Sequence, residues 1–302
     1  MNDKVIFEVI CPPLNWDKEK KQEFIEKICV LLKRNNLNYI NLPQIVDENR
    51  SGNRIFKFKP KEENYLFAKE LLSYSLNHFQ HKIDPIINIV VPRIPKEEFI
   101  EFFKMLYEMG YRNFIFVGKD NSNTEYPGLE VHQASYLIKE KYNDVKIGGI
   151  VIFHRENEIK RIINKINHGM DFFVSQIIYD TQDFENFINM PMDIKTTIYI
   201  SVAPISSQKE IDFLKWLGVK FNYHPVNNPQ KYFENQIKQV INKIIEENFN
   251  CILKGRNLYF GINVEHITYN NIELSEEIIK LASLRVENLK ILSQKLLLKR
   301  GE

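Results

Sequence analysis

The chain has 302 residues and only 11 glycines, which is about half of the usual share of roughly 7%. Its 41 Lys and Arg residues nearly balance its 39 Asp and Glu residues, and 44% of the chain is hydrophobic. This composition excludes a disordered chain, and the balanced charge argues against a protein that binds nucleic acid or a membrane surface. Neither glycine-rich phosphate loop, G-x-G-x-x-G or G-x-x-x-x-G-K-[ST], occurs, so a nucleotide would have to bind in another way.

Cysteine usage and the first residues bear on the cellular compartment. The three cysteines, Cys11, Cys29 and Cys251, have the wide and irregular spacing that gives neither a disulfide framework nor a zinc knuckle. The first residues are too acidic and too briefly apolar for a signal peptide, and no run approaches the roughly eighteen apolar residues of a membrane span. We therefore expect a cytoplasmic protein with no membrane partner.

Short β-branched runs alternate with longer amphipathic runs along the chain, which is the pattern of alternating strands and helices. Strands are predicted over 4–10, 39–42, 86–91, 113–117, 145–152, 172–177, 196–202 and 258–264. Helices are predicted from near 17, over 63–76, from 96 to about 110, up to 141, and over 156–168, 182–188, 208–217, 230–247 and 275–298. Alternation of this kind gives a parallel sheet.

Eight strand–helix units favour a closed (β/α)8 TIM barrel, an α/β fold that uses residues 1–302 as one domain. The alternative is an open, doubly wound sheet. That fold usually has fewer strands and often a glycine-rich first turn, whereas the turn here is Cys11–Asn15, which contains no glycine. We therefore favour the barrel.

In a barrel, chemistry takes place at the carboxyl ends of the strands. Polar side chains on or just after the predicted strands are Glu8, Asn41, Asp120, His154, Gln176, Ser201 and Asn263. Carboxyl, amide and imidazole groups would thus meet at one mouth. No Ser-His-Asp order, Cys-His pair or metal set is evident among them.

Three segments resemble the methylenetetrahydrofolate reductase family. Residues 7–13 read Phe-Glu-Val-Ile-Cys-Pro-Pro, similar to the family's Phe-Glu-x-x-Pro-Pro opening. Residues 169–180 resemble its Gly-Ala-Asp-Phe-x-x-[Thr/Ser]-Gln-x-x-[Phe/Tyr]-Asp segment, and residues 259–263 look like its Phe-Tyr-Thr-Leu-Asn strand. Residues 41–44, 126–128 and 201–204 look closer to the family's divergent short branch, of mycobacterial type. Members of this family are (β/α)8 barrels.

The resemblance implies an enzyme that reduces 5,10-methylenetetrahydrofolate to 5-methyltetrahydrofolate with a hydride from NADH or NADPH. Glu8 stands at the position of the family's general acid, which protonates N10 and opens the five-membered ring. A carboxyl on an apolar strand fits this role, because desolvation raises its pKa. The alternative from the residues alone is a solvated glutamate at a strand end.

The resemblance also implies the groups that hold the folate. Gln176 stands where the family hydrogen-bonds the pterin, and an amide suits this task because it both donates and accepts. Asn263 is implied as a second substrate-binding residue. Asp120 stands where the family has an aspartate near the flavin and pterin, and its carboxylate would stabilise the iminium cation. Its context differs, because residues 118–120 read Gly-Lys-Asp where the common branch reads Arg-Gly-Asp. The alternatives are a bracing amide for Gln176 and an ordinary loop residue for Asp120.

In most members of the family, FAD carries the hydride to the folate. Gly149 and His154 align with a segment that lines the flavin site, Asp120 lies near it, and Lys165 stands at a basic position near the FAD phosphates. From sequence alone, Lys165 reads as an exposed helix lysine. FAD is therefore expected, and direct transfer from NADH without a flavin is the alternative.

A non-catalytic folate-binding or partner-binding barrel is a further alternative. The protein is also expected to form a homo-oligomer.

Two further features are discounted. His78 and His81 are spaced like metal ligands on a helix, but no third ligand is evident, so a solvated pair is the simpler interpretation. Cys11 lies three residues after Glu8, where a small buried hydrophobic residue is expected.

Overall fold

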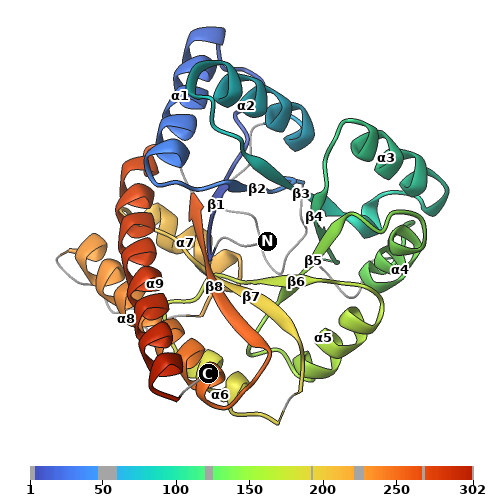
Figure 1. Ribbon diagram of the computed structural model, residues 1–302. Helices are drawn as coiled ribbons and strands as arrows, with labels where there is room; N and C mark the ends of the chain where they lie inside the picture. Colours follow the sequence, from blue (N-terminus) through green and yellow to red (C-terminus); the bar gives the residue numbers. More distant parts are fainter. Residues whose placement is uncertain are drawn as a thin grey trace.

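The protein is described from a computed structural model. The structure describes residues 4–46, 60–119, 125–191, 193–220, 228–266 and 269–300, and of residues 266 and 287–300 it describes only the backbone. Within these residues, eight strands alternate with helices and close into a barrel in which every strand is parallel to its two neighbours (Figure 1). The predicted single-domain barrel is confirmed, because β1 pairs with β8 and leaves no open edge.

The strands are β1 (Val5–Val9), β2 (Tyr39–Leu42), β3 (Asp84–Val90), β4 (Asn113–Val117), β5 (Lys146–Val151), β6 (Phe172–Ser175), β7 (Thr196–Val202) and β8 (Leu258–His266). The helices are α1 (Lys18–Arg34), α2 (Asn64–Phe79), the 3-10 turn η1 (Val91–Arg93), α3 (Lys96–Glu108), α4 (Val131–Lys141), α5 (Glu158–Asn167), α6 (Gln182–Ile188), α7 (Gln208–Trp216), α8 (Pro229–Leu253) and α9 (Ile272–Arg300).

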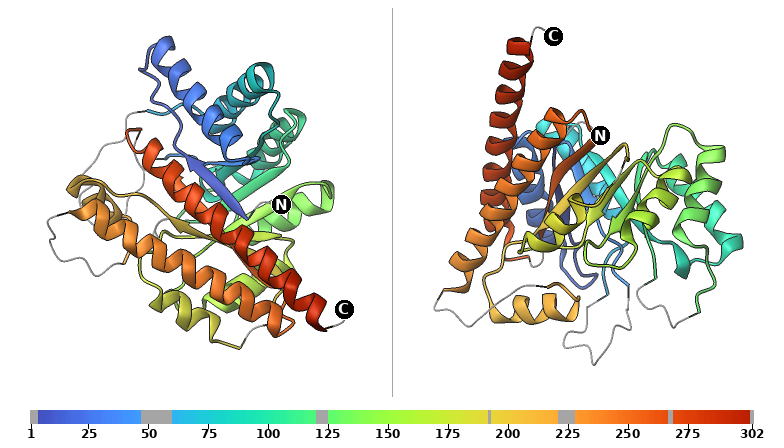
Figure 2. Two further views of the ribbon diagram at one scale, coloured as in Figure 1. Left: turned by 60° about the vertical axis from the view of Figure 1, so that its left-hand side comes forward. Right: turned by 90° about the horizontal axis from the view of Figure 1, so that it is seen from below.

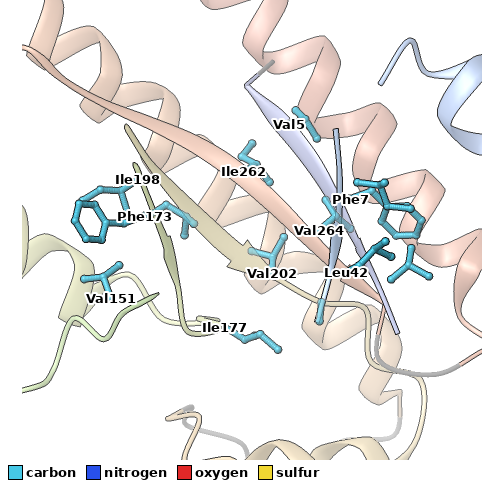
Figure 3. Packing of buried hydrophobic residues seen from close by; sticks show 14 of the residues in the cluster. Val5, Phe7, Leu42, Val151, Phe173, Ile177, Ile198, Val202, Ile262 and Val264 are labelled. Atoms are coloured by element: carbon cyan, nitrogen blue, oxygen red, sulfur yellow. The ribbon is translucent and has the colours of Figure 1, made fainter. Parts of the chain in front are cut away.

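The hydrophobic core has two layers, one on each face of the barrel wall. The larger layer lies between the strands and the surrounding helices, and Figure 3 shows Phe7, Leu42 and Val264 packed together in it. The smaller layer fills the barrel interior with Ile6, Ile86, Ile115, Phe172, Val174 and Tyr199. Successive side chains of a strand point to opposite faces, so nearly continuous apolar strands supply both layers. The interior layer closes the barrel below its mouth.

Polar caps set where several helices begin. The Asp17 carboxylate accepts a hydrogen bond from the backbone N–H of Lys20 at the start of α1. Ser207 and Glu210 form a reciprocal capping box at the start of α7. The last two helices, α8 and α9, lie side by side on the barrel wall, and α9 extends beyond the strands toward the C-terminus (Figure 2). None of the helices described combines the length and apolar character needed to cross a lipid bilayer.

Candidate active site

Glu8 points into the barrel at its carboxyl end. Ile6 belongs to the interior layer, and Glu8 follows it by two residues on β1, so both side chains lie on the same face of the strand. Its Oε2 accepts hydrogen bonds from Asn41 Nδ2 at 2.5 Å and from Asn263 Nδ2 at 3.1 Å. Strands β2 and β8 flank β1, so the barrel register brings these two predicted strand-end amides to the carboxyl.

Burial is the main influence on the proton affinity of Glu8. Desolvation raises the pKa of Glu8 to about 7, although the hydrogen bonds from Asn263 and Asn41 lower it. A carboxyl with this pKa holds a proton in part of the molecules near neutral pH, which an ordinary glutamate does not. The arrangement can therefore donate a proton to a bound ligand.

A second carboxyl, which sequence reasoning missed, stands beside Glu8. Glu265 on β8 is the register partner of Glu8, and both side chains line one cavity of about 220 Å³. We call it the acid cavity; its described lining is Glu8, Ile10, Pro43, Gln44, Ile45, Val46, Asn88, Val117, Ile177, Phe213, Trp216, Leu217 and Glu265. Burial and the nearby charge of Glu8 raise the pKa of Glu265 well above its ordinary range.

Three buried amide oxygens at this mouth have no protein partner among the described residues. They are the Oδ1 atoms of Asn41, Asn88 and Asn263, whose side chains are 1%, 6% and 0% exposed. A buried acceptor without a donor costs stability, so such groups call for a partner that the protein itself does not provide. They suit a ligand that carries several N–H donors.

Gln176 lies directly after β6, which ends at Ser175 and not at 177 as predicted. Its Nε2 donates to the Leu217 carbonyl at 2.9 Å. It lines a neighbouring cavity of about 200 Å³ together with His154, Asp183 and Lys220. Ile177 lines both this cavity and the acid cavity, so the two adjoin.

His154, which was predicted to line a flavin site, lines the same cavity as Gln176. Its Nδ1 is 3.5 Å from Asp183 Oδ2, and desolvation lowers its pKa. Gly149 is buried in β5, where an added Cβ would lie 2.8 Å from Met170 Sδ. Asp120 lies outside the described residues.

Lys165 lines a third cavity, of about 390 Å³, which we call the basic cavity. Its described charged lining is Arg93, Lys119, Glu130, Arg155, Arg161 and Lys165. Sequence reasoning anticipated only Lys165 of the group, because the arginines come from η1, the segment after β5, and α5 without any local motif. Val46 and Val117 line both the basic and the acid cavity, so a ligand in one lies next to the other.

Several cations of the basic cavity have partners among the described residues. Arg155 pairs with Glu158 and Lys119 pairs with Glu130 at 2.7 Å. Lys165 Nζ donates to the Ile150 carbonyl at 2.7 Å, and burial lowers the pKa of Lys165 to about 8. Together with Arg93 and Arg161, this donor set fits an anionic group such as the diphosphate of FAD or of a nicotinamide nucleotide.

Of the residues discounted from the sequence, Cys11 lies as expected and His81 does not. Cys11 is buried. His81 is buried rather than solvated, and its Nε2 lies 2.8 Å from the Leu37 carbonyl oxygen. No group of three metal-ligating side chains occurs in the described ranges.

The fold is a (β/α)8 barrel, and half-buried acids and buried amides at its carboxyl end form a candidate ligand site at that face. The sequence matches the methylenetetrahydrofolate reductase family over residues 75–236, just over half of the chain. The chain therefore belongs to the methylenetetrahydrofolate reductase family. A comparison with curated protein sequences gave no significant match.

Solved structures with the same fold include an uncharacterised protein from Clostridium thermocellum that binds two copies of 5-methyl-5,6,7,8-tetrahydrofolic acid. It is 20% identical, with 93% of this chain and 94% of that chain covered and a TM-score of 0.70. A GH113 β-1,4-mannanase is 11% identical, with 93% and 98% covered and a TM-score of 0.56. At sequence identities this low, the similarity to these structures shows a shared fold and no more.

Proposed function

We propose that the protein reduces 5,10-methylenetetrahydrofolate to 5-methyltetrahydrofolate with a hydride from NADH or NADPH, and that Glu8 is the general acid. The observation that carries this proposal is the protonatable Glu8 carboxyl, with a pKa raised to about 7, at the mouth of a barrel of this family. The folate that the Clostridium thermocellum protein binds also supports a folate ligand here.

In this proposal the folate pterin occupies the acid cavity. The pterin carries N–H donors, and the unpartnered Oδ1 of Asn88, which lines this cavity, is an acceptor suited to them. The Glu8 carboxyl then donates its proton to N10, the bond between N10 and the bridging carbon breaks, and a 5-iminium cation forms. Hydride transfer to that carbon gives the 5-methyl product, and Glu8 is left as a carboxylate.

Gln176 is proposed as a further pterin contact that would exchange its bond to Leu217 for one to the ligand. Asp120 is proposed as the carboxylate that stabilises the iminium cation. His154 and Gly149 are proposed near the cofactor, with His154 in the cavity that Gln176 also lines.

The basic cavity is proposed to hold FAD by its diphosphate, through Arg93, Arg161 and Lys165. Bound FAD would supply the hydride to the folate after taking it from the nicotinamide nucleotide. The alternative is that the diphosphate of NADH itself occupies this cavity. The same cations support it, because both cofactors present the same anionic group.

The test is to record the visible spectrum of the purified protein while NADH and methylenetetrahydrofolate are added in turn. A yellow protein whose colour is bleached by NADH and restored by methylenetetrahydrofolate supports FAD as the bound cofactor. A colourless protein that oxidises NADH only when folate is present supports direct transfer. A protein that binds folate and never oxidises NADH or NADPH would contradict the proposed reduction and favour a folate-binding barrel.

A further inference from the structure

Glu265 is a half-buried carboxyl with no part in the mechanism above. It is the Cα partner of Glu8 in the β1–β8 register, and both side chains line the acid cavity. The register places the two carboxyls on the same face of adjacent strands. No other pair of carboxyls faces this cavity within the described lining.

One amide nitrogen contacts both acids. Asn263 Nδ2 lies 3.1 Å from Glu8 Oε2, 3.5 Å from Glu265 Oε1 and 2.9 Å from Ser201 Oγ. The Ser201 hydroxyl is in turn hydrogen-bonded to Glu265. The two carboxyls are therefore held in one polar cluster by neutral donors.

The groups that face Glu265 are mostly uncharged. Glu8 faces it from β1 and Ser201 from β7. Burial, and after it the charge of Glu265, raise the pKa of the Tyr179 phenol, which follows β6. Glu210 of α7 acts on the same phenol. The described lining of the acid cavity contains no Lys, Arg or His.

Two desolvated carboxyls so placed cannot both ionise readily, because each negative charge disfavours the other. Their protons are then lost in two steps that belong to the pair and not to either residue. The first step leaves one proton that both acids can hold.

We propose that Glu265 is the second proton site of the general acid: it shares one proton with Glu8 and passes a new proton to Glu8 after each ring opening. This rests on the proposed function. In each turnover the Glu8 O–H bond breaks as N10 gains the shared proton, which leaves both acids as carboxylates. Water then protonates Glu265, and this proton passes to the Glu8 carboxylate, so each turnover consumes one proton and one hydride. Glu265 is thus a positioning residue for the proton and does not contact the reacting atoms.

The test is the pH dependence of kcat/KM in Glu265→Gln. Wild type is expected to keep activity above neutral pH, because the pair still holds one proton. In Glu265→Gln, Glu8 is the one acid of the pair and has no neighbouring negative charge to disfavour its ionisation. The alkaline limb of the variant's pH profile should therefore lie at least about one pH unit lower than that of wild type. The two proteins should agree within about threefold at pH 6, and Glu265→Asp should restore the limb. A uniform loss at every pH with an unmoved limb would overturn the proposal.

An infrared measurement keeps this test separate from the reductase activity. The C=O stretch of a protonated carboxyl is recorded at pH 9 without substrate, in wild type, Glu8→Gln and Glu265→Gln. The shared proton predicts a band in wild type that weakens in both variants. If wild type has this band but no reductase activity, the proposed function fails and the shared proton stands. A band unchanged in both variants would refute the shared proton whatever the activity.

Discussion

Glu8 can act as an acid because of the residues around it. An exposed glutamate has lost its proton well below neutral pH, and burial at the barrel mouth raises the pKa of Glu8 to about 7. Asn41 and Asn263 hold the carboxyl in place but favour its charged form, so burial has to outweigh their hydrogen bonds. The proton that Glu8 would donate in the proposed ring opening thus depends on burial more than on any single neighbour.

Lys165 offers a residue-scale test of the basic cavity. Burial lowers its pKa to about 8, so its charge is present below that pH and is lost as the pH rises through it. We expect Lys165→Met to weaken FAD binding roughly tenfold at pH 7. Flavin fluorescence titration of the apoprotein at several pH values measures this.

Wild-type affinity for FAD should also fall as the pH rises past about 8, and Lys165→Met should lack that step. Lys160→Met is the matched control, because Lys160 is exposed on the same helix and lines none of the three cavities. Equal loss of affinity in both variants would contradict a specific role for Lys165.

At the scale of elements, the basic cavity depends on how the segment before α4 packs against η1. Gly128 N–H donates to the Pro92 carbonyl at 2.9 Å, and the Arg93 guanidinium lies 5.7 Å from the centre of the Tyr126 ring. A Cβ at Gly128 would lie 2.5 Å from the Val91 carbonyl oxygen and would also clash with that of Ile94. This close approach of two backbones requires glycine.

Gly128→Ala should therefore destabilise the protein by about 3 kcal/mol, since the backbone on both sides would have to move. Urea unfolding followed by circular dichroism measures this free energy. Gly118→Ala is the control, because its Cβ would meet only Val131 Cγ1 at an ordinary 3.7 Å. If Gly128→Ala is as stable as Gly118→Ala, the packing described here is wrong.

Element boundaries explain which site residues could be predicted from sequence. Strands over 39–42, 113–117 and 196–202 were predicted at their observed bounds. A polar residue precedes each of these runs, and Pro43 and Gly118 follow the first two. Glu265 was missed because strand eight was predicted to end at 264, whereas β8 continues to His266. The signal was present, since Asn263 and Glu265 are two residues apart and so share a face of the strand.

Lys165 illustrates the opposite error. Its position on an amphipathic helix predicts an exposed side chain, but the packing of α5 on the barrel brings its ammonium to the Ile150 carbonyl. Arg93 joins it in the basic cavity from a segment distant in sequence, and Arg155 from the segment between β5 and α5. Convergence of this kind depends on tertiary contacts, which local patterns do not encode.

For the whole molecule, barrel closure is what assembles the site. Glu8 comes from the first strand, Asn263 and Glu265 from the last, and the β1–β8 pairing joins them. The acid cavity shares lining residues with both other cavities, so folate, hydride donor and proton donor would meet at one mouth. The fold thereby accounts for how a chain without glycine-rich phosphate loops could still bind a dinucleotide.

The central claim is tested most directly by the product that Glu8→Gln forms. Wild type and Glu8→Gln are each incubated with methylenetetrahydrofolate and NADH or NADPH, and 5-methyltetrahydrofolate is quantified by chromatography, with folate affinity measured in parallel. The exposed Glu97→Gln serves as a control. We expect wild type and Glu97→Gln to form the product, and Glu8→Gln to bind folate within a few-fold of wild type yet form at least about 100-fold less. Product formation by Glu8→Gln at the wild-type rate would contradict the account.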